Sequence, residues 1–189
     1  YLLLGQRPEE NGEFRAAVPG SYVFSEAFDS TFAKRMRAAR LAAERAKRLA
    51  EAGKDVVLLV DSLSAYVQAA EKQSGDRESG LLAGKKLFAL ARKISAGGSL
   101  TVIATYPDAE CGTAPAKDEF ESAANAVFCF SRKTAAEGII PAFDFSRSFT
   151  KRSEQYSQEY DKEFVRRLRS AAEETGTAGV LSLIEKNEE

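Results

Sequence analysis

The sequence contains no histidine and only two cysteines among its 189 residues. Without imidazole there can be no Ser-His nucleophile, no histidine proton shuttle and no histidine-ligated metal. Cys111 and Cys129 are not spaced as a CxxC pair, so neither a zinc ribbon nor a disulfide framework is supported. We interpret the two cysteines as reduced thiols of a cytosolic protein.

Long hydrophobic runs and an excess of one charge are also missing. No apolar run approaches the roughly 18 residues of a membrane span, and the first residues do not form a signal peptide. The 27 basic and 28 acidic side chains nearly cancel, so no overall field attracts nucleic acid or an anionic membrane. Because 44% of the residues are hydrophobic, the chain can bury a core. The composition predicts a soluble, folded, cytoplasmic protein with no membrane partner.

Apolar runs bounded by polar residues recur along the chain. An unbroken apolar run between charges is typical of a strand that is covered on both faces in a parallel sheet. The runs that predict such buried strands are residues 1–4, 55–61, 99–106 and 126–131. Since helical patterns alternate with these runs, we expect an α/β fold with an open, mainly parallel sheet flanked by helices. The chain starts within a strand pattern, which suggests a piece of a longer protein.

The clearest helical pattern covers residues 32–49. Its apolar residues recur at helical spacing, Asp29 and Ser30 are candidate N-caps, and Gly53 supplies the stop. Shorter helical patterns are typical of residues 64–70, 81–94 and 118–125.

The remaining segments are polar or irregular. Residues 7–13 and 71–80 indicate a turn and a loop, and residues 139–145 an edge or hairpin strand, because Pro141 cannot donate a ladder hydrogen bond. Apolar residues spaced four apart near the end predict a helical C-terminal tail. We expect residues 1–152 to form the core and residues 153–189 a helical tail of the same domain.

Polar residues just past the apolar runs are the first candidates for a site, because ligands of open α/β sheets bind at the carboxyl ends of strands. They are Gln6, Arg7, Asp61, Ser62, Thr105 and residues 131–133. Residues 58–61, LLVD, have the form of a Walker B motif, whose carboxylate helps to hold the magnesium of a nucleoside triphosphate. The motif alone leaves open a solvated strand end or a helix N-cap.

A Walker B carboxylate needs a phosphate loop beside it. The similar segment 80–86, GLLAGKK, has one residue too few between its glycines, a lysine where Ser or Thr must reach the metal, and no preceding strand. We interpret it as the start of a helix. A phosphate loop for this site would lie upstream or in a partner chain.

The helix predicted over residues 32–49 is locally basic. Its cations are Lys34, Arg35, Arg37, Arg40, Arg45, Lys47 and Arg48, against the single Glu44. One interpretation is a nucleic-acid face and the other is a solvated helix surface. The second is favoured, because no aromatic residues alternate with the cations for base stacking.

Several stretches carry a family resemblance: LLLGQRPEE (2–10), AKRLAEAGKDVVLLVDS (46–62), GGSLTVIAT (97–105), SRK (131–133) and PAFDFSRS (141–148). In this order and spacing they resemble the ATPase domain of the transcription termination factor Rho family, the hexameric RecA-type RNA translocases of bacteria. The resemblance implies a RecA-like fold, ATP and Mg²⁺ as cofactors, and RNA and identical ring subunits as partners. The family's Walker A helix and oligonucleotide-binding barrel would precede residue 1.

The resemblance also implies a nucleotide pocket. Asp61 would be the Walker B carboxylate that acts on the metal, and Arg7, Ser62 and Arg147 would contact the nucleotide. Asp61 is thereby the residue on which both the motif and the resemblance converge.

Some positions depart from the family. Gln6 stands where the family has a catalytic glutamate, and an amide can orient the attacking water but cannot accept its proton. The family's arginine finger falls at Lys151, a poorer bidentate partner for phosphate, and Arg152 follows directly. Another family arginine is here Gly138.

The RNA-contacting loops of the family are altered as well. Asp76 and Arg77 replace a lysine context after the Walker B strand, and Thr113 stands where the second loop has a lysine. An acidic side chain repels a phosphate backbone, although Arg77 could compensate. We expect part of a Rho-like, ATP-dependent RNA translocase that is inactive without an upstream Walker A segment. The alternative is a degenerate structural or regulatory Rho-like domain.

Overall fold

A computed structural model describes residues 1–107, 114–155 and 159–188 of the chain. The chain divides into two compact units, Tyr1–Ala123 and Ala124–Glu189, and each is described by itself. The division at 152 into core and tail stays a prediction.

The first unit is built on one five-stranded sheet. Its strands are β1 (Leu2–Gln6), β2 (Phe24–Ala27), β3 (Asp55–Asp61), β4 (Arg92–Lys93) and β5 (Ser99–Ala104). They lie in the order β2-β1-β3-β5-β4, where β4 alone runs antiparallel to its neighbour. The predicted open, mainly parallel sheet is confirmed.

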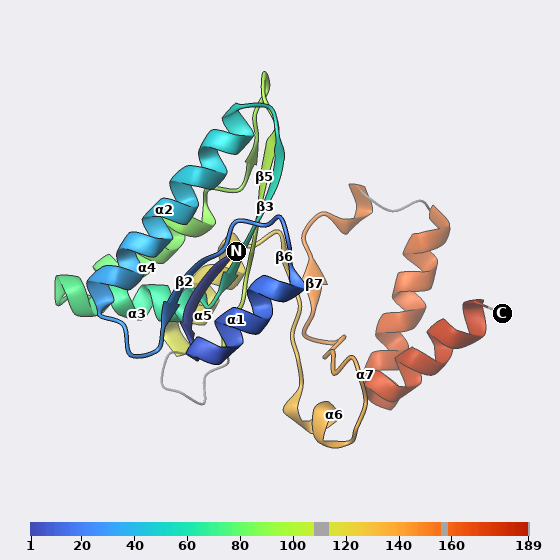
Figure 1. Ribbon diagram of the computed structural model, residues 1–189. Helices are drawn as coiled ribbons and strands as arrows, with labels where there is room; N and C mark the ends of the chain where they lie inside the picture. The colour runs from blue at the N-terminus through green and yellow to red at the C-terminus, as the bar shows by residue number, and fades with distance from the viewer. Residues whose placement is uncertain (108–113, 156–158, 189) are drawn as a thin grey trace. The chain divides into compact units, whose positions relative to one another are not determined.

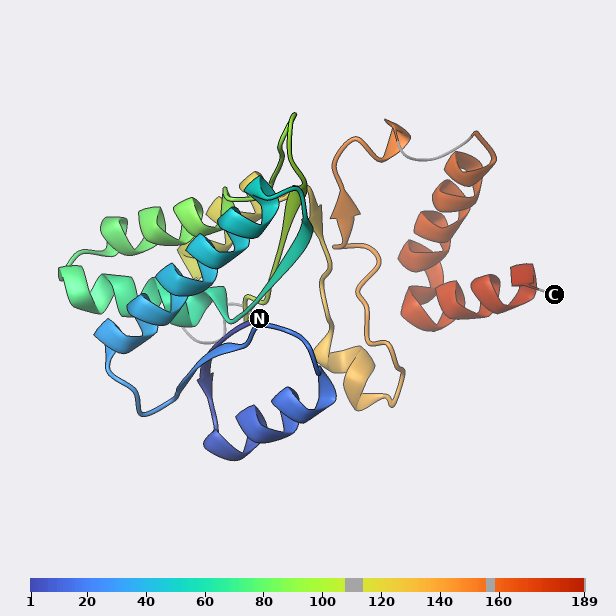
Figure 2. The ribbon, with the colours of Figure 1, turned by 45° about the horizontal axis from the view of Figure 1, so that its top comes forward.

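Helices pack against this sheet. They are α1 (Pro8–Ala17), α2 (Phe32–Glu51), α3 (Leu63–Ser74), α4 (Arg77–Phe88) and α5 (Ala114–Ala123). Figures 1 and 2 show α2, α3 and α4 on the same face of the sheet. Because parallel strands are joined by crossovers, α1 returns the chain from β1 to the start of β2, and α2 from β2 to the start of β3.

The core of the first unit joins α2 to the central strands. The buried side of α2 consists mainly of alanines, including Ala38, Ala42 and Ala46, which recur every four residues. Short side chains let the helix approach the sheet closely, where Leu58 and Val60 of β3 are buried beneath it. This packing holds the carboxyl end of β3 in a defined position.

Several expectations for the first unit are wrong. The N-cap of α2 is Thr31 and not Asp29 or Ser30. Residues 81–94 are not one helix, because α4 ends at Phe88 and Arg92–Lys93 form β4.

Residues 7–13 form most of α1 and not a turn, because Pro8 begins a helix favourably and acidic residues follow in the first turn. Residues 71–80 are not one loop: α3 ends at Gly75 (φ 74°) and α4 starts directly after its N-cap, Asp76. N-cap chemistry at Asp76 explains the early start of α4.

The glycine-rich segment that mimics a phosphate loop lies inside α4, as expected of a helical segment. A Cβ atom on Gly84 would stand 2.6 Å from Cγ2 of Val67 and 2.7 Å from Phe120, and one on Gly80 would stand 2.9 Å from Cβ of Glu71. These glycines let α4 pack closely against α3 and α5. Their role in the fold is close packing between helices.

The second unit contains a small two-stranded sheet and helices. Its elements are β6 (Ala126–Val127), α6 (Arg132–Ala136), β7 (Phe149–Thr150), the 3₁₀ helix η2 (Ser153–Gln155) and α7 (Glu159–Glu188). The strands β6 and β7 are antiparallel, and α7 breaks at Gly176, where φ is 68°. The predicted helical C-terminal tail is confirmed.

The expected third buried strand, residues 126–131, is wrong. Only Ala126 and Val127 pair as a strand, while Phe128 and Phe130 are 67% and 66% exposed. The edge or hairpin strand expected over residues 139–145 is also wrong, because this segment contributes a single isolated antiparallel bridge, Phe143 to Phe130. The run 126–131 is apolar, but among the described residues Phe128 and Phe130 remain largely exposed beside the ring of Phe143.

No helix in the described part of the chain is both long and apolar enough to span a bilayer.

Candidate nucleotide site

Three side chains meet at the carboxyl end of the parallel sheet in the first unit. Gln6 is the last residue of β1, Asp61 the last of β3, and Thr105 directly follows β5. Nε2 of Gln6 donates to Oδ2 of Asp61 over 2.6 Å, and Oγ1 of Thr105 donates to Oδ1 of Asp61, also over 2.6 Å. Both oxygens of the Asp61 carboxylate are therefore held by neutral donors from the two neighbouring strands.

The backbone fixes this cluster from both sides. The register pairs Leu3 of β1 with Asp61, which brings the end of β1 alongside the end of β3. The N–H of Thr105 donates to the carbonyl of Val60 over 2.9 Å, and the carbonyl of Thr105 accepts from Leu63 over 3.0 Å. Thr105 thus ties β5 to β3 and to the first residue of α3.

Ser62 follows Asp61 across a cis peptide bond and caps α3. Its Oγ accepts from the N–H of Ala65 over 3.2 Å and lies 2.9 Å from Oγ of Ser64. The helix cap is therefore Ser62 and not Asp61. Of the two alternatives open for Asp61, the N-cap is excluded, and the carboxylate is half-buried among polar partners.

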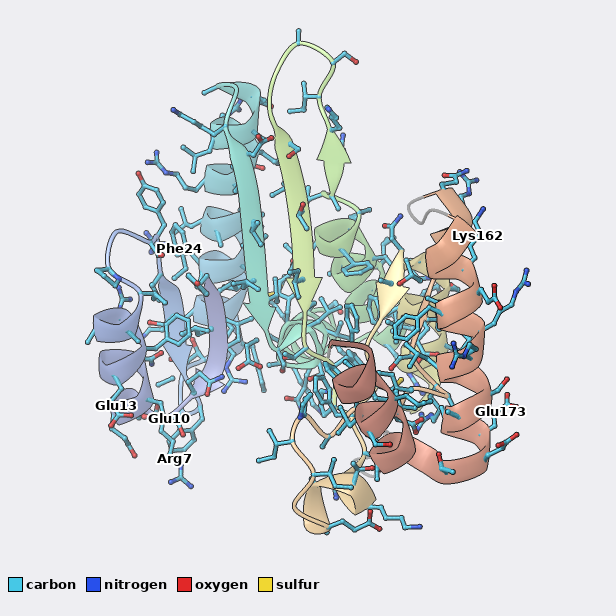
Figure 3. The ribbon with its side chains drawn as sticks, turned by 90° about the vertical axis from the view of Figure 1, so that its right-hand side faces the viewer. Arg7, Glu10, Glu13, Phe24, Lys162 and Glu173 are labelled. Atoms are coloured by element: carbon cyan, nitrogen blue, oxygen red, sulfur yellow. The ribbon has the colours of Figure 1, made fainter. Side chains whose placement is uncertain are left out.

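Arg7 stands between this cluster and α1. It is the N-cap residue of α1, and its backbone N–H donates to Oε2 of Glu10 over 2.9 Å. Figure 3 shows the Arg7 side chain near Glu10 at the start of α1. The side chain is exposed, so its reach toward a nucleotide stays a prediction.

The donors at the strand ends suit a hard cation. Asp61 supplies a carboxylate, and Ser62, Thr105 and Gln6 supply hydroxyl and amide oxygens, the ligand type that Mg²⁺ prefers. Within the described residues no three Asp, Glu, His or Cys side chains gather into a cage for a metal. One carboxylate fits a magnesium ion that keeps its waters and is shared with substrate phosphates.

The other predicted nucleotide and finger residues belong to the second unit. The N–H of Arg147 donates to Oδ1 of Asp144 over 3.1 Å, and the N–H of Lys151 donates to the carbonyl of Asn125 over 2.8 Å. Arg152 has a left-handed φ of 54°. None of the three lines the open pocket of about 400 Å³ in this unit, beside the break in α7. Their roles toward a nucleotide stay predictions.

The predicted RNA contacts have a local structural explanation. Asp76 caps α4: its carboxylate accepts from the N–H of Ser79 over 2.9 Å, from the hydroxyl of Ser79 over 2.7 Å and from the N–H of Glu78 over 3.2 Å. The bonds from Ser79, and then that from Glu78, lower the pKa of Asp76. Arg77 is the exposed first residue of α4, and Thr113 lies outside the described residues.

Sequence patterns brought out the members of the strand-end cluster but not its bonding. Thr105 was a strand-end candidate with no assigned role, and the structure makes it a partner of Asp61. The signal that could have identified it is a hydroxyl residue directly after the apolar strand next to the Walker B strand. Gln6 is predicted to orient the attacking water, and the structure adds that its Nε2 donates to Asp61; the role toward water stays a prediction.

The fold and the cluster define a class of protein. A mainly parallel sheet with a strand-end carboxylate, held between two neighbouring strands, is that of a RecA-like nucleotide-binding domain. The chain belongs to the ATP synthase alpha/beta family, whose nucleotide-binding domain matches residues 1–150.

Curated relatives agree with the resemblance found in the sequence. The transcription termination factor Rho of Streptomyces coelicolor is 36% identical over 200 residues, which cover 98% of this chain and 47% of that protein. Rho of Escherichia coli K12 is 37% identical over 167 residues, or 81% of this chain and 39% of that protein. The chain thus spans less than half the length of these relatives, and its predicted similarity to Rho is confirmed.

Solved structures support the fold. The ATPase EscN of the type III secretion system of enteropathogenic E. coli, in its assembled form, matches with a TM-score of 0.80 and 25% identity, over 99% of this chain and 48% of that one. A prototypical ATPase from the type III secretion system of pathogenic bacteria matches with a TM-score of 0.78 and 25% identity, over 88% and 53%. The RecA-like expectation is confirmed.

Proposed function

We propose that this chain is part of a Rho-like, ATP-dependent RNA translocase whose identical subunits form a ring. The observation that carries the proposal is the Gln6–Asp61–Thr105 cluster at the strand ends, the edge of the sheet where nucleotides bind in such folds. Family membership and the similarity to Rho support the same reading.

Each residue of the cluster has a task in this proposal. Asp61 holds the metal through bound water, and Thr105 keeps the carboxylate aimed along the sheet edge. Bound Mg²⁺ neutralises charge on the phosphates of ATP. Because Nε2 of Gln6 donates to Asp61, its Oε1 is the atom free to orient the attacking water. Ser62 and Arg7 stand at the same strand ends and would contact the nucleotide.

The remaining roles follow from the family. Arg147 would complete the nucleotide pocket, and Arg152 or Lys151 would reach the phosphates of a neighbouring subunit. Asp76, Arg77 and Thr113 would form weak RNA contacts, since of two lysine positions of the family one is acidic here, Asp76, and the other uncharged, Thr113. The G-x-x-x-x-G-K-[ST] motif is not in these 189 residues, so phosphate binding would depend on a segment outside them.

A second function is favoured by one feature, the amide at position 6. An amide cannot take the proton of the attacking water, so the domain would hold nucleotide or shape a ring without turning it over. This alternative is an inactive structural or regulatory Rho-like domain. Hydrolysis measurements separate the two.

The test is steady-state ATP hydrolysis by the full-length parent protein, with and without RNA. Asp61→Asn should abolish magnesium-dependent turnover, whereas the matched change Asp55→Asn, at the opposite end of β3, should leave it unchanged. Gln6→Glu should raise kcat with little effect on nucleotide affinity, because general-base assistance contributes about 10²- to 10⁴-fold. An unmodified parent faster than about 10 s⁻¹, or a lower rate in Gln6→Glu, contradicts the assignment of Gln6.

A parent with no hydrolysis, in which Gln6→Glu restores none, would instead favour the inactive domain. A complementary measurement uses the chain itself. Isothermal titration with Mg-ATP should detect no binding tighter than about 100 µM, roughly −5.5 kcal/mol, because the phosphate-cradling amides and lysine are absent.

A further inference from the structure

The solvent side of α2 carries a row of exposed cations. Four cations, Lys34, Arg37, Arg45 and Arg48, and one apolar residue between them, Leu41, recur at intervals of three and four residues. They therefore lie along one side of the helix. All five are exposed, while the alanines of the opposite side are buried in the core. At 1.5 Å per residue the row extends over about 21 Å. We call these five residues the α2 basic face.

The cations of the α2 basic face are only partly neutralised. Arg48 pairs with Glu51 over 2.7 Å, and both side chains remain largely exposed. Lys34 and Arg37 have no ion pair within the part of the chain that the structure describes. The exposed Glu44 beside the face is paired with Lys47 over 2.8 Å, so Glu44 and Glu51 each have a cation of their own. Lys34, Arg37 and Arg45 are left to give the face a positive potential, although the whole chain carries a net charge of −1.

An aromatic ring stands at the edge of this face. The guanidinium of Arg45 lies 4.3 Å from the centroid of the Tyr22 ring, and Nη2 of Arg45 donates to the Tyr22 hydroxyl over 2.6 Å. The tyrosine is 53% exposed, and its carbonyl accepts from the amino group of Tyr1 over 2.7 Å. The tertiary fold thus places an aromatic ring from outside α2 beside Arg45, whereas the aromatic residue of α2 itself, Phe32, is the first residue of the helix.

We propose that the α2 basic face, together with Tyr22, binds single-stranded nucleic acid. Phosphates would lie against Lys34, Arg37 and Arg48, and a base would stack on the Tyr22 ring, over which the Arg45 guanidinium already lies. Cations in a row beside an aromatic plane are the combination by which proteins hold single strands without reading sequence. An acidic protein helix would need an apolar seam as well, and Leu41 is the single apolar residue of the face.

This inference does not depend on the proposed ATPase function. The face lies on the exposed side of α2, whereas the strand-end cluster is formed by β1, β3 and the residue after β5. Binding is measured on the chain alone and without nucleotide. If the parent does not hydrolyse ATP, this proposal is unaffected. If the chain does not bind nucleic acid at the α2 basic face, the proposed ATPase function is unaffected.

The experiment is fluorescence anisotropy of the full chain with a labelled oligouridine of about 12 nucleotides, titrated from low salt to about 150 mM. Binding should be weak, and the logarithm of affinity should fall with the logarithm of salt at a slope of about −2 to −3, since three or four phosphates each contribute about −0.7. No binding at low salt would overturn the proposal.

Charge reversal locates the contact. Arg37→Glu with Arg45→Glu should weaken binding at least about 10-fold, because two attractive contacts become repulsive. Lys72→Glu with Lys93→Glu makes the same change in net charge at exposed positions of α3 and β4 and should weaken it less than about 3-fold. An equal loss in both pairs would mean a global charge effect. Arg37→Gln gives the same comparison if reversal disturbs folding, which circular dichroism reports.

Stacking has its own test. Tyr22→Ala should weaken binding about 5- to 150-fold, the measured range for loss of one stacked base, whereas Tyr22→Phe should keep most of the affinity. If Phe weakens binding as much as Ala, the ring is not a stacking platform. Polyglutamate with the same net charge as the oligonucleotide serves as a competitor. If it displaces the labelled oligonucleotide as well as an unlabelled oligonucleotide does, the face binds acidic polymers in general, and the choice of nucleic acid is overturned.

Discussion

Two apolar runs of similar composition have opposite fates in this chain. Residues 55–61, DVVLLVD, form β3, with β1 on one side and β5 on the other. One face is buried, with Leu58 and Val60 only 3% and 2% exposed, whereas Val57 is 56% exposed, so the cover expected on both faces is only partly present. Residues 126–131, AVFCFS, pair over two residues only and leave their phenylalanines largely exposed. The difference teaches that an apolar run sets a tendency to form a strand, whereas its neighbours decide whether it is buried.

The same contrast holds for the two units as a whole. The core cluster of the first unit joins three strands to α2, α3, α4 and α5. In the second unit the buried apolar residues among those described are Ala124, Ala172 and Val180. Contacts among Phe128, Phe130, Phe143 and Phe145 and side-chain hydrogen bonds to the backbone supplement this small core. We expect core substitutions to cost more in the first unit than in the second.

The largest expected effect comes from the two runs themselves. Leu58→Ala should lower the free energy of unfolding by about 2–5 kcal/mol, because it leaves a cavity beneath α2. Phe130→Ala removes a larger side chain but should cost less than about 1.5 kcal/mol, since it loses mainly a ring contact to Phe143 at 4.8 Å. Urea unfolding followed by circular dichroism measures both. If both variants lose the same free energy of unfolding, the two apolar runs do not differ in burial as described.

A second experiment asks whether close packing in the first unit extends to its helix layer. Gly84→Ala should cost about 1–3 kcal/mol, because the new methyl group would clash with Val67 and Phe120. Gly12→Ala in α1 meets nothing within 4 Å and should stabilise the chain by about 0.5–1 kcal/mol through helix propensity. Both variants replace glycine by alanine, so they differ only in their surroundings. If both change the free energy of unfolding in the same direction, α4 is not tightly packed against α3.

The helix cap between these two helices gives a pH-dependent test. Asp76→Ala should lower the melting temperature at pH 7 by about 2–4 °C, because the N–H groups of Glu78 and Ser79 lose their acceptor. The pKa of Asp76 lies below its ordinary value of 3.8, so its contribution is present above pH 3.8 and is lost as pH falls through the lowered pKa. The gap between variant and parent should therefore close in acid. Asp76→Asn, which can still cap, is the control.

The smallest effect is expected at a tie in the second unit. The hydroxyl of Thr177 donates to the carbonyl of Phe143 over 2.6 Å and anchors α7 just after its break at Gly176. Thr177→Val keeps the shape and should cost about 0.5–1.5 kcal/mol. Hydrogen exchange should accelerate in residues 177–184 and remain unchanged in β3. Faster exchange in both places would mean that the two units unfold together.

The strand-end residues were predictable, but their bonding was not. Apolar runs that end at Gln6 and Asp61 are visible in the sequence, and parallel strands bring their carboxyl ends to one edge. That the amide of Gln6 donates to Asp61 depends on β1 lying next to β3 in the register that pairs Leu3 with Asp61. Neither neighbour order nor register follows from a local pattern.

Some polar residues between the apolar runs have a structural role that the sequence pattern does not reveal. The family resemblance places Asp76 at an RNA contact, and the structure shows a second use for its carboxylate, which caps α4. Residues 7–13 carry turn-forming Pro8 and Gly12, and they became α1, because proline is equally suited to a first helical turn. Polar residues between apolar runs predict a connection without determining its form.

The sequence by itself determined the parallel sheet, the long amphipathic α2, the helical tail and the acidic end of β3, since these depend on periodicity and on short polar signals. The tertiary structure alone decided which strands are neighbours, which apolar run is covered, and that Tyr22 meets Arg45 from 23 residues away. The physical reason is that periodicity is a property of one segment, whereas burial and hydrogen-bond partnership belong to pairs of segments that only folding brings together.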